Sequence, residues 1–183
     1  MIIDPIFERV FKKLYGKPCW GVKQGVGSCL TFEFGRPRLE MREPKQLDKR
    51  FTRKVRELLA LRHVHVRGQW HLWIYFCDWE IFFKGKLLAR SNSWDKTIQK
   101  AARILDGQKL VCFSIVPRGN RSVFDFDLGA SLVTRPCDRR GEQWLLFEPS
   151  RKVLTLRADK RYKYTSAKSR AGGPWKPVFL NRK

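Results

Sequence analysis

An α+β fold is predicted, in which an antiparallel β-sheet meander is packed by an N-terminal helix and one or two further helices. Three features of the sequence predict it. Alternating apolar and polar residues recur between turn signals, as antiparallel strands require. Other stretches repeat apolar residues at helical spacing. The chain has 183 residues, 43% of them hydrophobic, so a single core of ordinary domain size accounts for its length.

Three segments have helical periodicity. Asp4 followed by Pro5 signals the start of a short amphipathic helix near the N-terminus. Residues 45–61 place apolar residues at helical spacing and cations on the opposite side, which predicts a second amphipathic helix with an exposed basic face. Ser93 is the expected cap of a third helix, which ends at Gly107.

The remaining regular segments have strand character. Residues 19–42 alternate around two turn signals, which predicts a three-stranded antiparallel meander, and residues 63–90 read as central strands. Residues 109–156 have turn signals about every 8–12 residues, which predicts a second antiparallel meander. We therefore expect one α+β domain over residues 1–159, followed by a basic C-terminal extension over residues 160–183.

The charge of the chain is its most unusual property. Lys and Arg number 39 against 17 Asp and Glu, which gives a net charge of +22. Residues 36–67 carry 11 basic and 4 acidic side chains, and residues 160–183 carry 8 basic and no acidic ones. Such self-repulsion disfavours a compact chain, so a polyanionic partner is the simplest explanation. A solvated surface kept basic for solubility is the alternative.

The residues expected to bind nucleic acid are the cations of the second helix, of several strand turns and of the C-terminal extension, together with three aromatic residues. The aromatic residues suit single-stranded or RNA-like ligands, whose bases stack on rings, although they could equally anchor the extension to the domain. The full set is Lys49, Arg50, Arg53, Lys54, Arg56, Arg118, Arg121, Arg139, Arg140, Lys160, Arg161, Tyr162, Lys163, Tyr164, Lys168, Arg170 and Trp175. A further cationic turn contains Arg151 and Lys152.

No catalytic motif, metal site or cofactor is predicted. His63, His65 and His71 match no established zinc spacing, so ordinary strand histidines are the preferred interpretation. Asp125 and Asp127 alternate on one strand and could hold Mg²⁺ in a metal-dependent nuclease. Phosphate-binding loops and nucleophile motifs are not found.

The cysteines and the apolar segments indicate the cellular compartment. The five cysteines are an odd number without a C-x-x-C pair, so we expect reduced core residues rather than disulfides. The sequence contains no signal-peptide pattern and no long apolar run. A cytoplasmic protein without a membrane partner is expected.

Two stretches carry a resemblance to known sequences. Residues 70–79 and an ending that runs from Trp144-Leu145-Leu146-Phe147 to Tyr162 resemble a loosely defined group of small uncharacterised bacterial proteins. Their ending is W-x-L-F-x-P-D-G-x-V-L-x-x-R-x-D-G-x-Y, and some are similar to immunity-protein-like domains. The resemblance implies a bacterial origin and a β-rich fold, and no catalytic residues. In this chain Arg151-Lys152 and Asp159-Lys160 stand at the two expected Gly turns, which adds positive charge.

The function expected is binding of RNA or DNA, mainly through the backbone, by a cytoplasmic protein that could be a subunit of a larger nucleoprotein or defence-type complex with other protein subunits. An immunity-like module that recognises an acidic protein is the alternative. A metal-dependent nuclease is a second alternative.

Overall fold

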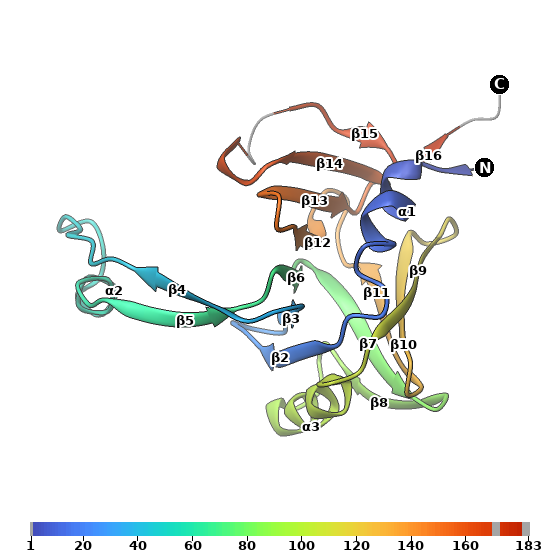
Figure 1. Ribbon diagram of the computed structural model, residues 1–183, viewed down its shortest axis with the longest axis horizontal. Helices are drawn as coiled ribbons and strands as arrows, with labels where there is room; N and C mark the ends of the chain where they lie inside the picture. The colour runs from blue at the N-terminus through green and yellow to red at the C-terminus, as the bar shows by residue number, and fades with distance from the viewer. Residues whose placement is uncertain (1, 170–172, 181–183) are drawn as a thin grey trace.

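The protein is built from two antiparallel sheets that share one core, and an arm that projects from them (Figure 1). The computed structural model describes residues 2–169 and 173–180. The five-stranded sheet has the order β8-β7-β11-β10-β9, and its strands are β7 (Cys77–Phe83), β8 (Lys86–Arg90), β9 (Leu110–Val116), β10 (Arg121–Phe126) and β11 (Ala130–Pro136). The fold is thus the α+β architecture that was predicted.

The seven-stranded sheet has the order β15-β14-β13-β12-β6-β3-β2. Its strands are β2 (Cys19–Gln24), β3 (Leu30–Phe34), β6 (Trp70–Ile74), β12 (Glu142–Phe147), β13 (Lys152–Arg157), β14 (Arg161–Ser166) and β15 (Lys176–Pro177). The short strands β1 (Ile2–Ile3) and β16 (Phe179–Leu180) pair with each other and bring the two ends of the described chain together.

Helix α1 (Pro5–Phe11) forms where the sequence predicts it, because Asp4 accepts a hydrogen bond from the Ile6 backbone N–H at 3.0 Å and caps the helix. Its apolar face enters the core between the sheets, where the ring of Phe11 stacks on Phe113 of β9 at 3.7 Å. Helix α3 (Asp95–Leu105) buries its own apolar face, with contacts to β2 and β8. Each of these two helices therefore buries its apolar face against the sheets, as is typical of an amphipathic helix.

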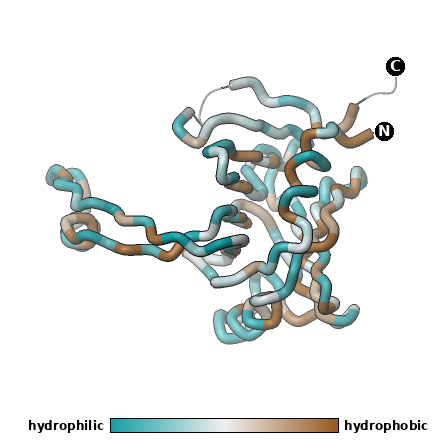
Figure 2. Tube along the Cα trace, in the orientation of Figure 1, coloured by the Kyte–Doolittle hydropathy of each residue, from teal (hydrophilic) through white to brown (hydrophobic). Residues whose placement is uncertain are grey.

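The arm consists of β4 (Arg38–Arg42), helix α2 (Arg53–Leu59) and β5 (His63–Arg67). It is inserted between β3 and β6, which are neighbours in the sheet, and it extends well away from the two sheets (Figure 1). No residue from 36 to 67 is buried. The hairpin has one apolar face, visible as hydrophobic stretches in Figure 2, which is formed by Leu39, Met41, Val64 and Val66.

Two expectations for this region were wrong. Residues 19–42 form a hairpin of β2 and β3, but the third strand leaves the sheet and pairs with β5. The helix expected over residues 45–61 is limited to 53–59, and none of its residues is buried. The apolar spacing is real, but at the tip of an arm there is no sheet to bury the apolar face, and burial is what sustains most helices in proteins.

The later strands correct two further expectations. Strands β9, β10 and β11 are consecutive neighbours, but β12 crosses to the other sheet and pairs with β6. Residues 160–183 were expected to extend from the domain, yet 161–166 form β14 within the seven-stranded sheet. The alternation of Tyr162 with polar neighbours is a strand signal that the high charge of this segment hides.

The cysteines differ in their surroundings. All five are free; Cys19 and Cys77 are buried in the core, whereas Cys112 and Cys137 are exposed. The expectation that Cys112 lies in the core was wrong, because β9 is an edge strand with a register shift beside that residue. Among the residues described, no helix is both long and apolar enough to cross a bilayer.

Tyr162 belongs to the core rather than to a binding surface. Its side chain is only 3% exposed, and its hydroxyl donates a hydrogen bond of 2.6 Å to Asp4, the cap of α1. Burial, together with this carboxylate, raises the pKa of the Tyr162 hydroxyl. The prediction that Tyr162 stacks on a nucleic-acid base was therefore wrong.

Replacing Tyr162 with Phe should remove this bond and lower the free energy of unfolding by about 1–3 kcal/mol, since the hydrogen bond is made to a charged group. Urea denaturation measures the effect. The affinity for an oligonucleotide should not change. A loss of affinity without a loss of stability would contradict the assignment of Tyr162 to the core.

Candidate nucleic-acid interface

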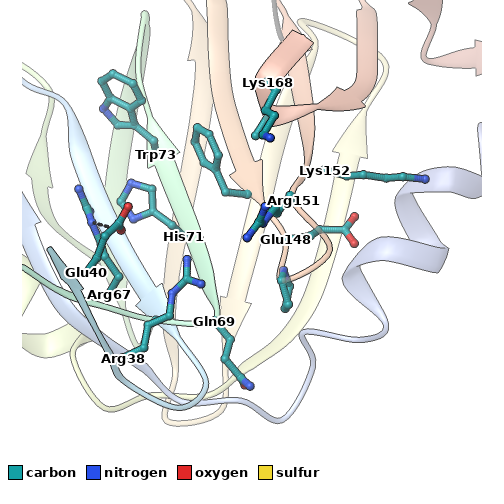
Figure 3. A pocket seen from close by; sticks show the side chains of 14 residues that line it. Arg38, Glu40, Arg67, Gln69, His71, Trp73, Glu148, Arg151, Lys152 and Lys168 are labelled. Atoms are coloured by element: carbon teal, nitrogen blue, oxygen red, sulfur yellow. Dashed lines mark ion pairs between the residues drawn. The ribbon is translucent and has the colours of Figure 1, made fainter. Parts of the chain in front are cut away.

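A pocket of about 410 Å³ lies where the base of the arm meets the outer face of the seven-stranded sheet (Figure 3). The arm contributes one wall, β6 the floor, and the β12–β13 turn and the 3₁₀ helix η1 (Ala167–Ser169) the opposite wall. The side chains that define it are Arg38, Glu40, Arg67, Gln69, His71, Trp73, Phe147, Glu148, Arg151, Lys152 and Lys168.

Strand alternation explains why the floor is aromatic. Along β6, Trp70, Leu72 and Ile74 are buried in the core, so His71 and Trp73 point to the opposite face. In the register of the sheet His71 lies beside Phe147 of β12, and the two ring centroids are 5.7 Å apart. Three rings from two neighbouring strands thus form the floor.

The walls of the pocket are strongly cationic. Arg38 and Arg67 lie directly opposite each other in the β4–β5 hairpin, an arrangement that destabilises a strand pair unless the charges are compensated. Arg67 reaches Glu33 at 3.0 Å and Glu40 at 3.9 Å. Arg38, by contrast, forms no ion pair with any described residue. An anion between the two guanidinium groups would remove the repulsion.

A buried carboxylate organises the floor. Glu33 of β3 is 5% exposed and accepts hydrogen bonds from Arg67 at 3.0 Å, from the Gly68 backbone N–H at 2.9 Å and from Nδ1 of His71 at 2.9 Å. Burial alone would raise the pKa of Glu33, but these bonds outweigh it and the pKa is lowered. Glu33 is therefore an anion that fixes both Arg67 and the His71 ring.

Arg151 enters the pocket from a strained turn. It has φ of 59°, in the left-handed region that favours Gly. Lys160, in the β13–β14 turn, has φ of 62°. The sequence resemblance had placed Gly at both turns, and both positions hold cations in a conformation that Gly adopts more easily. A non-Gly residue in such a conformation costs stability, and at Arg151 the conformation directs the guanidinium into the pocket.

Replacing Arg151 with Gly should therefore weaken binding without lowering stability. Relief of the left-handed conformation gains about 1–2 kcal/mol, and the freedom of Gly in the unfolded chain offsets about 0.5–1 kcal/mol of it. The free energy of unfolding should not fall, while the affinity for an oligonucleotide should drop roughly tenfold, because one charged group no longer meets a phosphate.

The matched control is Lys84→Gly. Lys84 also has positive φ, at 49°, and carries the same charge, but it lies in the β7–β8 turn outside the pocket. Its replacement should leave affinity unchanged. Equal losses of affinity in both variants would mean that overall charge, rather than the pocket, binds the ligand.

Six of the predicted cations lie together at the other end of the sandwich. Asn120 donates hydrogen bonds to the carbonyls of Arg157 and Ala158 at 3.0 and 3.1 Å, and the Ala158 N–H donates to Gly141 at 2.9 Å. Three turns are joined in this way. They carry Arg118, Arg121, Arg139, Arg140, Lys160 and Arg161. The turn of Arg151 and Lys152 lies at the opposite end of the β12–β13 hairpin.

The other predicted aromatic residues contact cations of the chain itself. Burial, and then the Glu148 carboxylate, raise the pKa of Tyr164 to about 12, and the Lys152 ammonium lies 4.9 Å from its ring. Trp175 has Arg157 and Lys163 over its ring at 4.1 and 4.4 Å. Arg170 lies outside the described residues. Of the predicted residues that the structure describes, only Lys168 lines the pocket.

The cations predicted on the second helix lie at the far end of the arm. Lys49 and Lys54 are exposed, Arg50 pairs with Asp48 at 2.6 Å and Arg53 with Glu57 at 2.7 Å. Such exposed pairs add little to stability. Together with Arg56, these residues extend the positive charge outward from the pocket.

The two metal hypotheses involve groups that have other partners. His63 and His65 stack at 6.0 Å on β5, while His71 is bound to Glu33. Asp125 accepts from Ser131 at 2.6 Å and Asp127 from the Lys109 N–H at 2.8 Å. Within the described ranges, no three His, Cys, Asp or Glu side chains converge as metal ligands would.

Sequence reasoning did not single out several residues that line the pocket, nor the carboxylate beneath its floor. Glu33, Arg38, Arg67, Trp73 and Phe147 come together through strand register, which periodicity does not reveal. The available signal was the outward position of His71 and Trp73 on a strand whose other residues are apolar. No family model, no curated protein and no solved structure was found to match the chain.

Proposed function

We propose that this protein binds single-stranded nucleic acid along the outer face of the seven-stranded sheet, with the arm along one side of the bound strand. The observation that carries the proposal is the pocket at the base of the arm, where cations on two walls flank three rings on the floor. Recognition is mainly of the backbone and largely independent of sequence. The protein acts alone or as a subunit of a larger nucleoprotein complex.

The distribution of charge supports a phosphate ligand. Arg38 and Arg67 on the arm face Arg151 and Lys168 across the pocket, whereas the side chain of Lys152 points away from it toward Tyr164 (Figure 3). Phosphates of one strand passing between these walls would neutralise both. Guanidinium groups suit this role because their planar donors match phosphate oxygens in pairs.

The aromatic floor supports a single strand rather than a duplex. Bases that are not paired can stack on protein rings, and such stacking tolerates any sequence. Trp73 packs at 4.4 Å against Tyr75, further along the same strand, so the rings continue beyond the pocket. A duplex would present its phosphates to the walls while its bases stayed out of reach of the floor.

Fluorescence anisotropy with a labelled single-stranded oligonucleotide, repeated over a range of salt concentrations, tests the proposal. Contacts from the four cations on the two walls predict a slope of log K against log salt of about −3, since each phosphate contact on a single strand contributes about −0.7. Lys96→Ala with Lys100→Ala, both on the exposed side of α3, is the control and should keep the wild-type slope. No binding in dilute buffer would refute the proposal.

The apolar face of the arm favours a second candidate function, that of a module that recognises an acidic protein. Leu39, Met41, Val64 and Val66 are each more than half exposed, and the opposite face of the same hairpin carries Arg38, Arg42 and Arg67. Exposed apolar surface of this kind is typical of protein contacts. Both functions can reside in one chain, because the apolar and cationic faces of the hairpin are opposite.

Replacing Met41 and Val64 together with Ser tests whether the two faces act independently. The oligonucleotide affinity measured by anisotropy should remain at the wild-type level, because neither side chain lines the pocket. A tenfold loss of affinity would instead place the apolar face within the nucleic-acid site.

A further inference from the structure

His71 is held as a catalytic base is held in many enzymes. Its Nδ1 is bound at 2.9 Å to the Glu33 carboxylate, a buried anion, so this nitrogen carries the proton. The other nitrogen, Nε2, then has a free lone pair, and no described residue forms a hydrogen bond with it. The ring lines the pocket between Arg67 and Arg151 (Figure 3). A base oriented by a carboxylate and exposed to a cationic pocket is suited to proton transfer.

We propose that the pocket cleaves RNA without a metal ion, with His71 as the general base. This inference rests on the proposed function, since it assigns RNA as the ligand and adds chemistry at the same site. The 2′ hydroxyl of a bound nucleotide loses its proton to Nε2 of His71 and attacks the adjacent phosphorus. The bond from O2′ to phosphorus forms and the bond from phosphorus to O5′ breaks.

The leaving oxygen requires a proton, and Lys168 supplies it. Lys168 lies on η1, across the pocket from the arm, and its ammonium group is a donor of protons (Figure 3). The products are a 2′,3′-cyclic phosphate and a 5′ hydroxyl. His71 then returns its proton to water and Lys168 regains one, so the residues are restored without any other reactant.

The remaining side chains have electrostatic roles. Arg38 and Arg151 are placed to stabilise the extra negative charge on the phosphorane oxygens, an effect that is commonly the largest part of catalysis. Arg67 is tied to Glu33 and holds the floor together. Glu33 touches no reacting atom; it is a positioning residue that keeps the proton of His71 on Nδ1.

The experiment incubates labelled RNA with the protein in excess EDTA and follows cleavage by gel and by mass spectrometry. Cleavage to a cyclic phosphate is expected. Single-stranded DNA and 2′-O-methyl RNA should be bound without being cleaved, because they have no free 2′ hydroxyl. His71→Gln should lower the rate about 10²–10⁴-fold, the usual contribution of a general base, and should weaken binding of 2′-O-methyl RNA far less, because two of the three floor rings remain.

Glu33→Gln tests the positioning role. An amide has one acceptor oxygen where the carboxylate has two, so it keeps either the Gly68 bond or the Arg67 bond and no longer fixes the tautomer of His71. The expected result is a kcat about 10²-fold lower, with KM and the affinity for 2′-O-methyl RNA close to wild type and a lower melting temperature, because one buried donor loses its acceptor. A fall in melting temperature with unchanged kcat would assign Glu33 a structural role alone.

An RNA substrate with sulfur in place of O5′ distinguishes the role of the general acid from that of the general base. Replacing O5′ with sulfur gives a leaving group that needs no proton, so Lys168→Ala should be slow on RNA and close to wild type on the thio substrate. His71→Gln should be slow on both. Equal defects of Lys168→Ala on the two substrates would remove Lys168 from the proposed step.

The outcomes also distinguish this inference from the proposed function. If 2′-O-methyl RNA binds and RNA stays intact, cleavage is refuted while binding stands. If neither is bound, both are refuted. Cleavage that persists in His71→Gln, or that EDTA abolishes, would show that another activity is responsible.

Discussion

Excising residues 36–67 and joining Gly35 to Gly68 is expected to leave a folded protein whose affinity for single-stranded nucleic acid is at least about 100-fold weaker. The body should fold, because no residue of this segment is buried. The ends to be joined already touch: a Cβ atom on Gly68 would lie 2.6 Å from the Phe34 carbonyl oxygen. Phe34 pairs with Trp70, so the new connection is a short hairpin loop containing two glycines.

The weaker affinity follows from the charges removed. The segment carries a net charge of +7 and includes Arg38 and Arg67, which form one wall of the pocket. The salt slope should become shallower by about 0.7 for each phosphate that the protein no longer neutralises. Circular dichroism and a melting curve establish folding, and anisotropy measures binding. An excised protein that folds and binds with wild-type affinity would exclude the arm from the interface.

The second large effect is expected from two arginines on opposite walls. Arg38→Ala should lower affinity roughly tenfold, since a charged hydrogen bond to phosphate is worth about 1.5 kcal/mol or more. It should also stabilise the hairpin slightly, because the repulsion from Arg67 is removed. Combined with Arg151→Gly, the expected reduction is about 100-fold, because residues on separate walls contribute independently.

The informative result is whether the affinity losses of the two single variants add up in the double variant. The two single variants and the double variant form a cycle that is read by anisotropy at one salt concentration. A double variant no weaker than either single one would show that a strand does not contact both walls at once. Lys96→Ala with Lys100→Ala removes two charges from α3 and should bind as the wild type does.

Local patterns in the sequence were sufficient for much of the secondary structure. The cap at Asp4, the alternation along β3 and β6, and the helix that buries Ile98 and Leu105 all lie where periodicity placed them. Each of these segments meets a sheet or the core in the way its pattern requires. Patterning alone therefore predicted the elements and the fold class.

The arm shows where this reasoning fails. Helical spacing from Leu47 to Leu59 predicted a long buried face, but whether a face is buried depends on what the chain brings near it. The same limit applies to the pocket. Glu33 and His71 are 38 residues apart, and only the register of β3 against β6 places them in contact. Composition located the basic segments, but not the side chains within them that converge.

Ultraviolet crosslinking of a bound oligonucleotide, followed by mass spectrometry of the peptides, tests most directly where the ligand lies. Rings that stack on bases are the groups that crosslink readily, so adducts are expected on Trp73 and Phe147, with none on α3. Adducts confined to the turns around Arg118 and Arg139, or none from an oligonucleotide that is shown to be bound, would contradict an interface on the outer face of the seven-stranded sheet.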